Sequence, residues 1–245
     1  MVSFEIGDIK EFKNIIDVTE RYVPELRFDA SPEGVSFVAL NKGHVVFIGC
    51  NIRYDWFNAY ECEADTSFML DTFELKNALG RIKGSGTLTC ILNNDNFELK
   101  YSTNDGSTKK FKIGLISELY DAPTPPNLQY PINTMADFKQ LKEYCLDSLM
   151  YSDKVKFQFQ DDTILIGSSN DYTSYEGKVV LLESITENCQ VIISGDYLDT
   201  FFKLDISDTV TLNVGNDIPF YAIVKSEDET LSYSVLIAPR LEEDG

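Results

Sequence analysis

The residues of this 245-residue chain whose types and spacing suit catalysis or ligand binding are two acidic clusters, one histidine and one glycine pair. The adjacent carboxylates of Asp161-Asp162 and of Glu227-Asp228-Glu229 have the chemistry of metal ligands or of an acid–base pair. Both clusters lie between strand-like segments, where charged turn residues are usually solvated. His44 is the only histidine, so it cannot build a two-histidine metal site. Gly84-Ser85-Gly86 is too short for a phosphate loop and indicates a turn.

Sequence patterns typical of enzymes are absent. The chain contains no GxxxxGK[ST], GxSxG, HExxH or GxGxxG motif. We therefore expect no catalytic residue, no metal site and no cofactor, and we expect that the protein is not an enzyme. A β-rich acidic hydrolytic enzyme remains an alternative, and it would require Asp161 or Asp162 to take part in turnover.

The charge of the chain argues against simple nucleic-acid binding, because 40 acidic residues outnumber 21 basic ones and leave a net charge of −19. Nucleic-acid-binding proteins are usually basic, so phosphate contact requires the basic residues to gather on one surface. The five cysteines have no CxxC spacing and indicate reduced thiols in an intracellular protein. The sequence predicts no signal peptide and no membrane span.

Hydrophobic periodicity predicts four helices. Asp8 and Asp71 each stand three residues before a glutamate, a capping-box pattern that predicts the starts of the first two helices. Thr134 is the expected cap of the third helix, over Phe138–Leu149, and Asp196 that of the fourth, which extends to Leu204. The fourth helix is expected to bury Tyr197, Phe201 and Leu204.

The pattern of the first half returns in the second. Phe12-Lys13 and Phe138-Lys139 open helices 126 residues apart, and each helix leads into two strand-like segments joined by a turn. A second helix recurs at an offset of 125, from Asp71 to Asp196. The remaining segments are short and rich in β-branched or aromatic residues, as strands are. The sequence therefore predicts two similar α+β units.

A proline-rich segment separates the two halves. Pro123, Pro125 and Pro126 remove backbone amide donors and forbid a helix. We therefore predict an N-terminal domain of residues 1–117, an extended connector of residues 118–134 and a C-terminal domain of residues 135–245.

Several segments, in order along the whole chain, resemble the PCNA (proliferating cell nuclear antigen) sliding-clamp family. The stretch FDASPEGVSFVALNKGHVVFIGCNI resembles the family's strand, Glu-Gly turn and His-Val pair. Tyr54, Phe57, Tyr60 and Cys62 resemble its F-x-x-Y-x-C segment, and Ile218-Pro219 precedes the penultimate strand. Leu236–Arg240 with Glu242, Glu243 and Asp244 resembles its C-terminal LAPK/R signature and acidic tail.

The resemblance implies a ring-forming α+β fold with two similar DNA-clamp domains per subunit, helices lining the central hole and β-sheets outside. It implies a DNA sliding clamp that encircles duplex DNA independently of sequence. Such a clamp is a processivity factor and a binding platform for DNA polymerase, ligase and flap endonuclease in replication and repair. The implied partners are a clamp loader, PIP-box proteins and two further subunits, in a homotrimer or a heterotrimer of paralogues, with no membrane. The implied location is the nucleus of a eukaryote or the cytoplasmic nucleoid of an archaeon.

Three sets of residues take roles from this resemblance. The DNA-binding set is basic and lies mostly on the helices: Lys10, Lys13, Arg21, Lys76, Arg81, Lys83, Lys110, Lys139, Lys142 and Lys203. The partner groove, which takes the hydrophobic anchor peptide called the PIP box, comprises Leu40, His44, Val45, Phe47, Pro125, Pro126, Tyr130, Ile218, Leu236, Ala238 and Pro239. The subunit interface pairs two edge strands and includes Lys110, Lys112, Ile113, Tyr175, Lys178 and Val180.

The charge of the helices and one alternative function bear on these expectations. Acidic residues are about as numerous as basic ones on the helices, so the DNA-facing surface is expected to be only mildly positive, which suits weak, sequence-blind sliding. A clamp-like subunit of a DNA-damage checkpoint would share the fold and differ in its partners. It therefore remains an alternative.

Overall fold

The computed structural model describes residues 1–240 of the chain. The acidic residues Glu242, Glu243 and Asp244 lie outside the described residues. No helix among the described residues is long and apolar enough to cross a membrane. Cys50, Cys62, Cys90, Cys145 and Cys189 are all free thiols, and burial raises the pKa of Cys189 to about 11.

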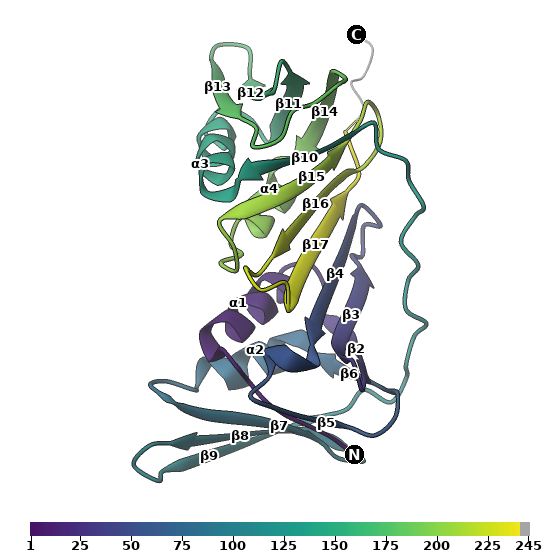
Figure 1. Cartoon of the computed structure of the whole chain (residues 1–245), viewed down its shortest axis with the longest axis vertical. Helices are drawn as coiled ribbons and strands as arrows, with labels where there is room; N and C mark the ends of the chain where they lie inside the picture. Colours follow the sequence, from purple (N-terminus) through teal and green to yellow (C-terminus); the bar gives the residue numbers. More distant parts are fainter. Residues whose placement is uncertain (241–245) are drawn as a thin grey trace. The chain divides into compact units, whose positions relative to one another are not determined.

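The first half of the chain contains two α-helices and nine strands (Figure 1). Its elements are β1 (Val2–Glu5), α1 (Ile9–Glu20), β2 (Glu25–Ser31), β3 (Gly34–Leu40), β4 (Val46–Arg53), a 3-10 turn (Tyr54–Trp56), β5 (Ala59–Cys62), β6 (Thr66–Asp71), α2 (Thr72–Gly80), β7 (Gly86–Leu92), β8 (Asn96–Thr103) and β9 (Thr108–Gly114).

The second half, as far as residue 240, contains two α-helices and eight strands. Its elements are β10 (Ile132–Asp137), α3 (Phe138–Leu149), β11 (Lys154–Gln160), β12 (Thr163–Ser169), β13 (Ser174–Val180), β14 (Cys189–Ser194), α4 (Gly195–Phe201), β15 (Thr209–Val214), β16 (Phe220–Lys225) and β17 (Leu231–Ile237). The α+β class is confirmed, and so is the recurrence of two helices with eight or nine strands.

The offset between the halves differs from the predicted 126 and 125 residues. Strands β2 and β3 recur as β11 and β12 after 129 residues, whereas β6 and α2 recur as β14 and α4 after 123. The apolar residues Phe12 and Phe138 suggested the wrong alignment, because Phe12 lies inside the first turn of α1 and Phe138 is the first residue of α3.

Two compact units make up the fold. Unit 1 comprises residues 1–42, 48–124 and 226–233, and unit 2 comprises residues 43–47, 125–225 and those from 234 onward. Strands β4 and β17 thus contribute residues to both units. The predicted division at residues 117 and 135 stays a prediction. It differs from these units in where it places residues 43–47 and 226–233, and β10 already begins at Ile132.

Helix starts follow the capping chemistry in part. Asp8 and Asp71 accept hydrogen bonds from the amides of Glu11 and Glu74, as predicted for α1 and α2. The predicted caps of the other two helices are wrong. Asp137 caps α3 by accepting from the Gln140 amide, while Thr134 lies inside β10. Ser194 occupies the cap position of α4 without a side-chain bond, and Asp196 falls in the first turn.

Unit 1 holds α1 and α2 side by side (Figure 1). Its first sheet has the strand order β5-β1-β7-β8-β9, so β9 forms one edge. Phe12, Ile15 and Ile16 of α1 are buried, as are Leu75 and Leu79 of α2. The buried hydroxyls of Thr19 and Tyr233 lie 3.2 Å apart and satisfy each other.

Unit 2 holds a sheet with the order β13-β12-β11-β14, in which β13 forms an edge and α3 packs against β11, β12 and β13. Gly177 permits this packing, because a Cβ atom there would lie 2.1 Å from Tyr144 Cδ1. Leu198 and Phe201 of α4 are buried, and so is Phe202 at the end of the helix. Tyr197, predicted to be buried, is only half-buried, because the buried face of the helix is centred on Leu198 and Phe201.

Candidate nucleic-acid interface and partner groove

Cationic side chains of unit 1 gather around the end of α2. Lys13 Nζ on α1 donates a hydrogen bond to the carbonyl oxygen of Ile82, which follows α2. Lys109 Nζ on β9 lies 2.9 Å from the carbonyl oxygen of Arg81. The carbonyl groups at the end of a helix carry partial negative charge and lack partners within the helix, so they attract ammonium groups. The end of α2 therefore brings residues of three elements together.

These cations line two adjoining depressions. One, of about 420 Å³, is lined by Lys13, Lys76, Arg81 and Lys83, together with Asp17. The other, of about 640 Å³, shares Arg81 and Lys83 with the first and adds Lys109, Lys110 and Phe111 of β9. We call this surface the basic band and define it as Lys13, Lys76, Arg81, Lys83 and Lys109. Burial and the neighbouring charge of Lys83 lower the pKa of Lys13.

Sequence reasoning selected Lys110 from β9 and left Lys109 out of the DNA-binding set. The structure brings Lys109 to the end of α2, whereas the ammonium group of Lys110 lies 2.8 Å from the carboxylate of Glu98. Successive residues of a strand point to opposite faces of the sheet. Lys109 lies opposite Tyr101 in the neighbouring strand β8, and the hydroxyl of Tyr101 donates a hydrogen bond to the carbonyl oxygen of Lys83. This pairing places Lys109 on the face of the sheet that meets the end of α2.

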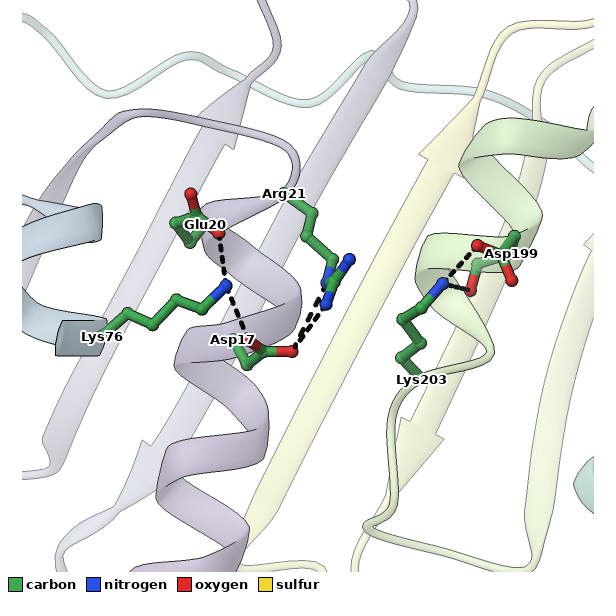
Figure 2. Close-up of polar contacts among 6 residues, drawn as sticks. All are labelled: Asp17, Glu20, Arg21, Lys76, Asp199 and Lys203. Atoms are coloured by element: carbon green, nitrogen blue, oxygen red, sulfur yellow. Dashed lines mark hydrogen bonds and ion pairs between the residues drawn. The ribbon is translucent and has the colours of Figure 1, made fainter. Parts of the chain in front are cut away.

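Ion pairs neutralise part of the predicted DNA-binding set in unit 1. Lys76 Nζ of α2 lies 2.8 Å from Asp17 Oδ1 and 2.9 Å from Glu20 Oε2, both of α1 (Figure 2). Arg21 lies 3.3 Å from the second oxygen of Asp17. The hydrogen bond that Lys76 donates to Asp17, followed by the one it donates to Glu20, raises the pKa of Lys76. Burial raises the pKa of Asp17, but the bond from Lys76 and the other nearby cations outweigh this and lower it.

Unit 2 pairs its helix cations in the same way. Lys203 bonds to Asp199, one helical turn earlier on α4 (Figure 2). Lys139, at the start of α3, lies 2.7 Å from Asp208, and the pair is well exposed. Lys142 is half-buried on α3, and Lys10 is exposed on α1 in unit 1. Half of the predicted DNA-binding set thus lies on the helices and most of the rest just after their ends, with several of its charges balanced by nearby carboxylates.

The predicted partner groove falls largely within unit 2. The amide of Ala238 donates to the carbonyl oxygen of Val45 at 2.8 Å, which places the end of β17 beside the segment before β4. Gly215 lets Pro131 and Ile218 approach, because a Cβ there would lie 2.8 Å from Pro131 and 2.6 Å from Ile218. His44, at a left-handed φ of 55°, is exposed, as are Pro125 and Pro126.

The remaining groove residues differ in exposure. Leu236, Ala238 and Pro239 are half-buried, while Phe47 is buried. Leu40, the one predicted member in unit 1, is 38% exposed. The partly exposed apolar side chains of unit 2 suit an apolar peptide plug.

Tyr130 supplies an unusual feature of this region. Its ring stacks on Tyr221 with 6.2 Å between the ring centroids. The hydroxyl is buried and has no hydrogen-bond partner within residues 1–240. Burial, with a smaller contribution from Tyr221, raises the pKa of Tyr130 to about 12. An unsatisfied buried hydroxyl carries a desolvation cost that a bound peptide group can relieve.

The predicted interface strands are edge strands in their sheets. Strand β9 pairs only with β8 in its sheet, and β13 only with β12. Lys112 is exposed on β9, whereas Ile113 is buried. On β13, Val180 is 62% exposed, and Tyr175 is half-buried against Asp147. Lys178 is exposed on the same strand. Unpaired edges that carry exposed apolar residues are typical of surfaces that pair with another chain.

The acidic clusters show structural roles. Asp161 and Asp162 both adopt left-handed backbone angles in the turn between β11 and β12, and Asp162 accepts bonds from Ser184 and Ile185. Asp228 accepts bonds from Ser226 and Thr230, which lower its pKa to about 2. Within residues 1–240, no group of three or more His, Cys, Asp or Glu side chains is placed to hold a metal ion.

Known proteins resemble the chain over its full length. Residues 1–117 match the family described as "Proliferating cell nuclear antigen, N-terminal domain". The DNA polymerase sliding clamp of Methanothermobacter thermautotrophicus is 27% identical over 243 residues, which is 99% of each chain. That of Pyrococcus horikoshii is 27% identical over 96% of each chain.

Solved structures show the same fold. The crystal structure of PCNA from Thermococcus kodakaraensis matches with a TM-score of 0.90 at 19% identity and covers 98% of this chain and all of that one. PCNA of A. fulgidus, solved with the C-terminal region of FEN-1, matches with a TM-score of 0.90 at 19% identity over both full chains. Residues 1–117 therefore match the PCNA N-terminal domain family, and the whole chain is similar in sequence to DNA polymerase sliding clamps and has the fold of solved PCNA structures.

Proposed function

We propose that this protein is a subunit of a DNA sliding clamp, which encircles duplex DNA and serves as a binding platform for DNA polymerase, DNA ligase and flap endonuclease. The observation that carries the proposal is the match to DNA polymerase sliding clamps over 99% of both chains, combined with the PCNA fold. A clamp acts by topological linkage and by binding clients, so it requires no catalytic residue.

The DNA-contacting surface in this proposal is the helix face that includes the basic band. Lys13, Lys76, Arg81, Lys83 and Lys109 offer ammonium and guanidinium groups to phosphate without any base-reading arrangement. Contact of this kind is independent of sequence and weakens with salt, as sliding requires.

Ring closure supplies the second part of the proposal. The edge strand β9 of one subunit pairs with β13 of the next, and three subunits with two units each complete the ring. Pairing removes both exposed edges and covers Val180. Identical subunits or paralogues are both compatible with this arrangement, and a clamp loader opens the ring for DNA entry. In this proposal the protein is located with the cellular DNA, in a nucleus or in a nucleoid.

Clients bind at the partner groove in unit 2. The A. fulgidus relative was solved with the C-terminal region of FEN-1, which supports peptide binding by proteins of this fold. An apolar anchor side chain enters between Leu236, Pro239 and the connector residue Tyr130, while free backbone groups receive main-chain hydrogen bonds.

The test combines mass with peptide binding. Light scattering at micromolar concentration is expected to give a trimer, and a fluorescent PIP-box peptide is expected to bind. Leu236→Asp should lower peptide affinity at least tenfold, because a carboxylate in an apolar pocket loses its hydration. Met150→Asp is the matched control. Met150 directly follows α3 and is 79% exposed, so this variant should bind the peptide as tightly as the wild type does. A protein that is monomeric and shows no measurable binding of the peptide would refute the clamp assignment.

A further inference from the structure

Asp17 occupies a position between two cations of unit 1. Its Oδ1 atom lies 2.8 Å from Lys76 Nζ, and its Oδ2 atom lies 3.3 Å from Arg21 (Figure 2). Glu20 lies on the same helix and accepts a second bond from Lys76 at 2.9 Å. Two carboxylates therefore face two cations, and the net charge of this cluster is zero.

The cluster overlaps the basic band, because Lys76 belongs to both. Asp17 and Lys76 line the same depression as Lys13, Arg81 and Lys83, and among residues 1–240 Asp17 is its only acidic lining residue. The four side chains of the cluster are between 23% and 40% exposed, so a phosphate can reach them. Opposite charges at such distances attract strongly enough to compete with a phosphate for the same cation.

We propose that Asp17 and Glu20 limit the DNA affinity of the clamp by holding Lys76 and Arg21 in ion pairs that a DNA phosphate has to replace. The inference rests on the proposed function, in which this helix face contacts DNA. It assigns to two acidic residues a negative role in DNA binding. A phosphate that binds Lys76 or Arg21 has to break their ion pairs, and this leaves the carboxylates of Asp17 and Glu20 unpaired next to the phosphate. Contact through the remaining band then stays weak enough for the ring to slide.

The effect is measurable as a salt dependence. Each phosphate contact contributes about 0.9 to the slope of log affinity against log salt concentration. Release of Lys76 and Arg21 adds up to two contacts, so the slope of Asp17→Asn/Glu20→Gln should be steeper than that of the wild type by about two units. At 0.1 M salt, each added contact raises the affinity about tenfold on the same basis.

The experiment measures fluorescence anisotropy of a labelled linear 30-base-pair duplex against NaCl concentration. The DNA affinity is expected to increase from the wild type to Glu20→Gln and again from Glu20→Gln to the double variant. Glu20→Gln alone removes one of the two carboxylates that hold Lys76, so a phosphate has one bond fewer to replace, and this variant tests the idea even if the double variant folds poorly. Glu183→Gln/Glu187→Gln changes the net charge equally on an exposed segment after β13 and should match the wild type.

Four results decide between the possible outcomes. Equal gains in the double variant and in the charge-matched control would overturn the inference, since net charge alone would explain them. Wild-type affinity in both Glu20→Gln and the double variant, with measurable wild-type binding, would also overturn it and leave the clamp function standing. Loss of the gain when Lys76→Ala/Arg21→Ala is added to the double variant would support it. No DNA binding by any variant at low salt would count against the proposed DNA surface itself.

Discussion

Lys109 Nζ lies 2.9 Å from the carbonyl oxygen of Arg81, and this contact attaches an edge strand of unit 1 to the end of α2. The neighbouring Lys110 points to the other face of the sheet and pairs with Glu98, which is only 8% exposed. Two consecutive lysines therefore have different environments and different expected roles.

Lys109→Ala should weaken DNA binding, because it removes a cation from the basic band. The salt-dependence slope is expected to fall by about one unit, with little change in stability. Lys110→Ala is the matched control. It should change the slope less than Lys109→Ala does, because Lys110 lines the same depression but is paired with Glu98. It should also lower the free energy of unfolding by about 1 kcal/mol, since it leaves the carboxylate of Glu98 unpaired. Equal slopes for the two variants would contradict the assignment of Lys109 to the band.

Val180→Asp should prevent ring closure. The side chain is 62% exposed on β13, and a carboxylate there would lose its hydration when β9 of another subunit pairs with this edge. Light scattering is expected to show monomers at concentrations where the wild type is a trimer. Phe73→Asp, at a 55% exposed position in the first turn of α2, should remain trimeric. A trimeric Val180→Asp variant would exclude β13 from the interface.

Tyr130→Phe should stabilise the free protein. The hydroxyl is buried without a hydrogen-bond partner within the described residues, so its removal recovers a desolvation cost of about 1 kcal/mol. The Tyr221 stack is retained in the variant. Urea unfolding measures the gain. The same variant should bind a PIP-box peptide less tightly if the hydroxyl bonds to the peptide. Destabilisation by the substitution would show that the hydroxyl has a partner in the folded protein.

Asp228→Ala should destabilise the protein in a manner that depends on pH. Hydrogen bonds from Ser226 and Thr230 lower the pKa of Asp228 to about 2, below its ordinary value of 3.8. Because the pKa of the carboxyl group is lower in the folded state than in the unfolded state, the ionised carboxylate stabilises the fold at a pH above its ordinary pKa. This contribution is lost as the pH falls through the pKa of the folded state. The difference between wild type and variant should therefore be complete above about pH 4 and shrink toward pH 2. A difference independent of pH would exclude the carboxylate as its cause.

The sequence was sufficient for the helices, because each has an apolar stripe and two have capping boxes. It placed α1, α2 and α3 correctly to within a few residues. It failed at the cap of α4, because Ser194 begins that helix without a side-chain bond and therefore leaves no capping pattern. It also misaligned the two halves, because aromatic residues recur at positions that are not equivalent in the fold.

The site was less predictable than the fold. Basic residues on helices can be counted in a sequence, but their ion pairs depend on contacts between elements. Lys76 and Asp17 lie 59 residues apart in sequence and 2.8 Å apart in space. The choice between Lys109 and Lys110 depends on which face of β9 meets α2, and strand alternation alone does not identify that face. The partner groove and the subunit interface stay predictions that rest on family position.

Retention on DNA of different topology tests the central claim most directly. The protein is placed by a clamp loader on nicked circular plasmid DNA, separated from free protein by gel filtration, and then treated with an enzyme that cuts the plasmid once. A ring that encircles duplex DNA stays with the circular plasmid at moderate salt and is lost after linearisation. Equal retention on circular and linear DNA, or no retention with a loader that is active on a reference clamp, would contradict the account.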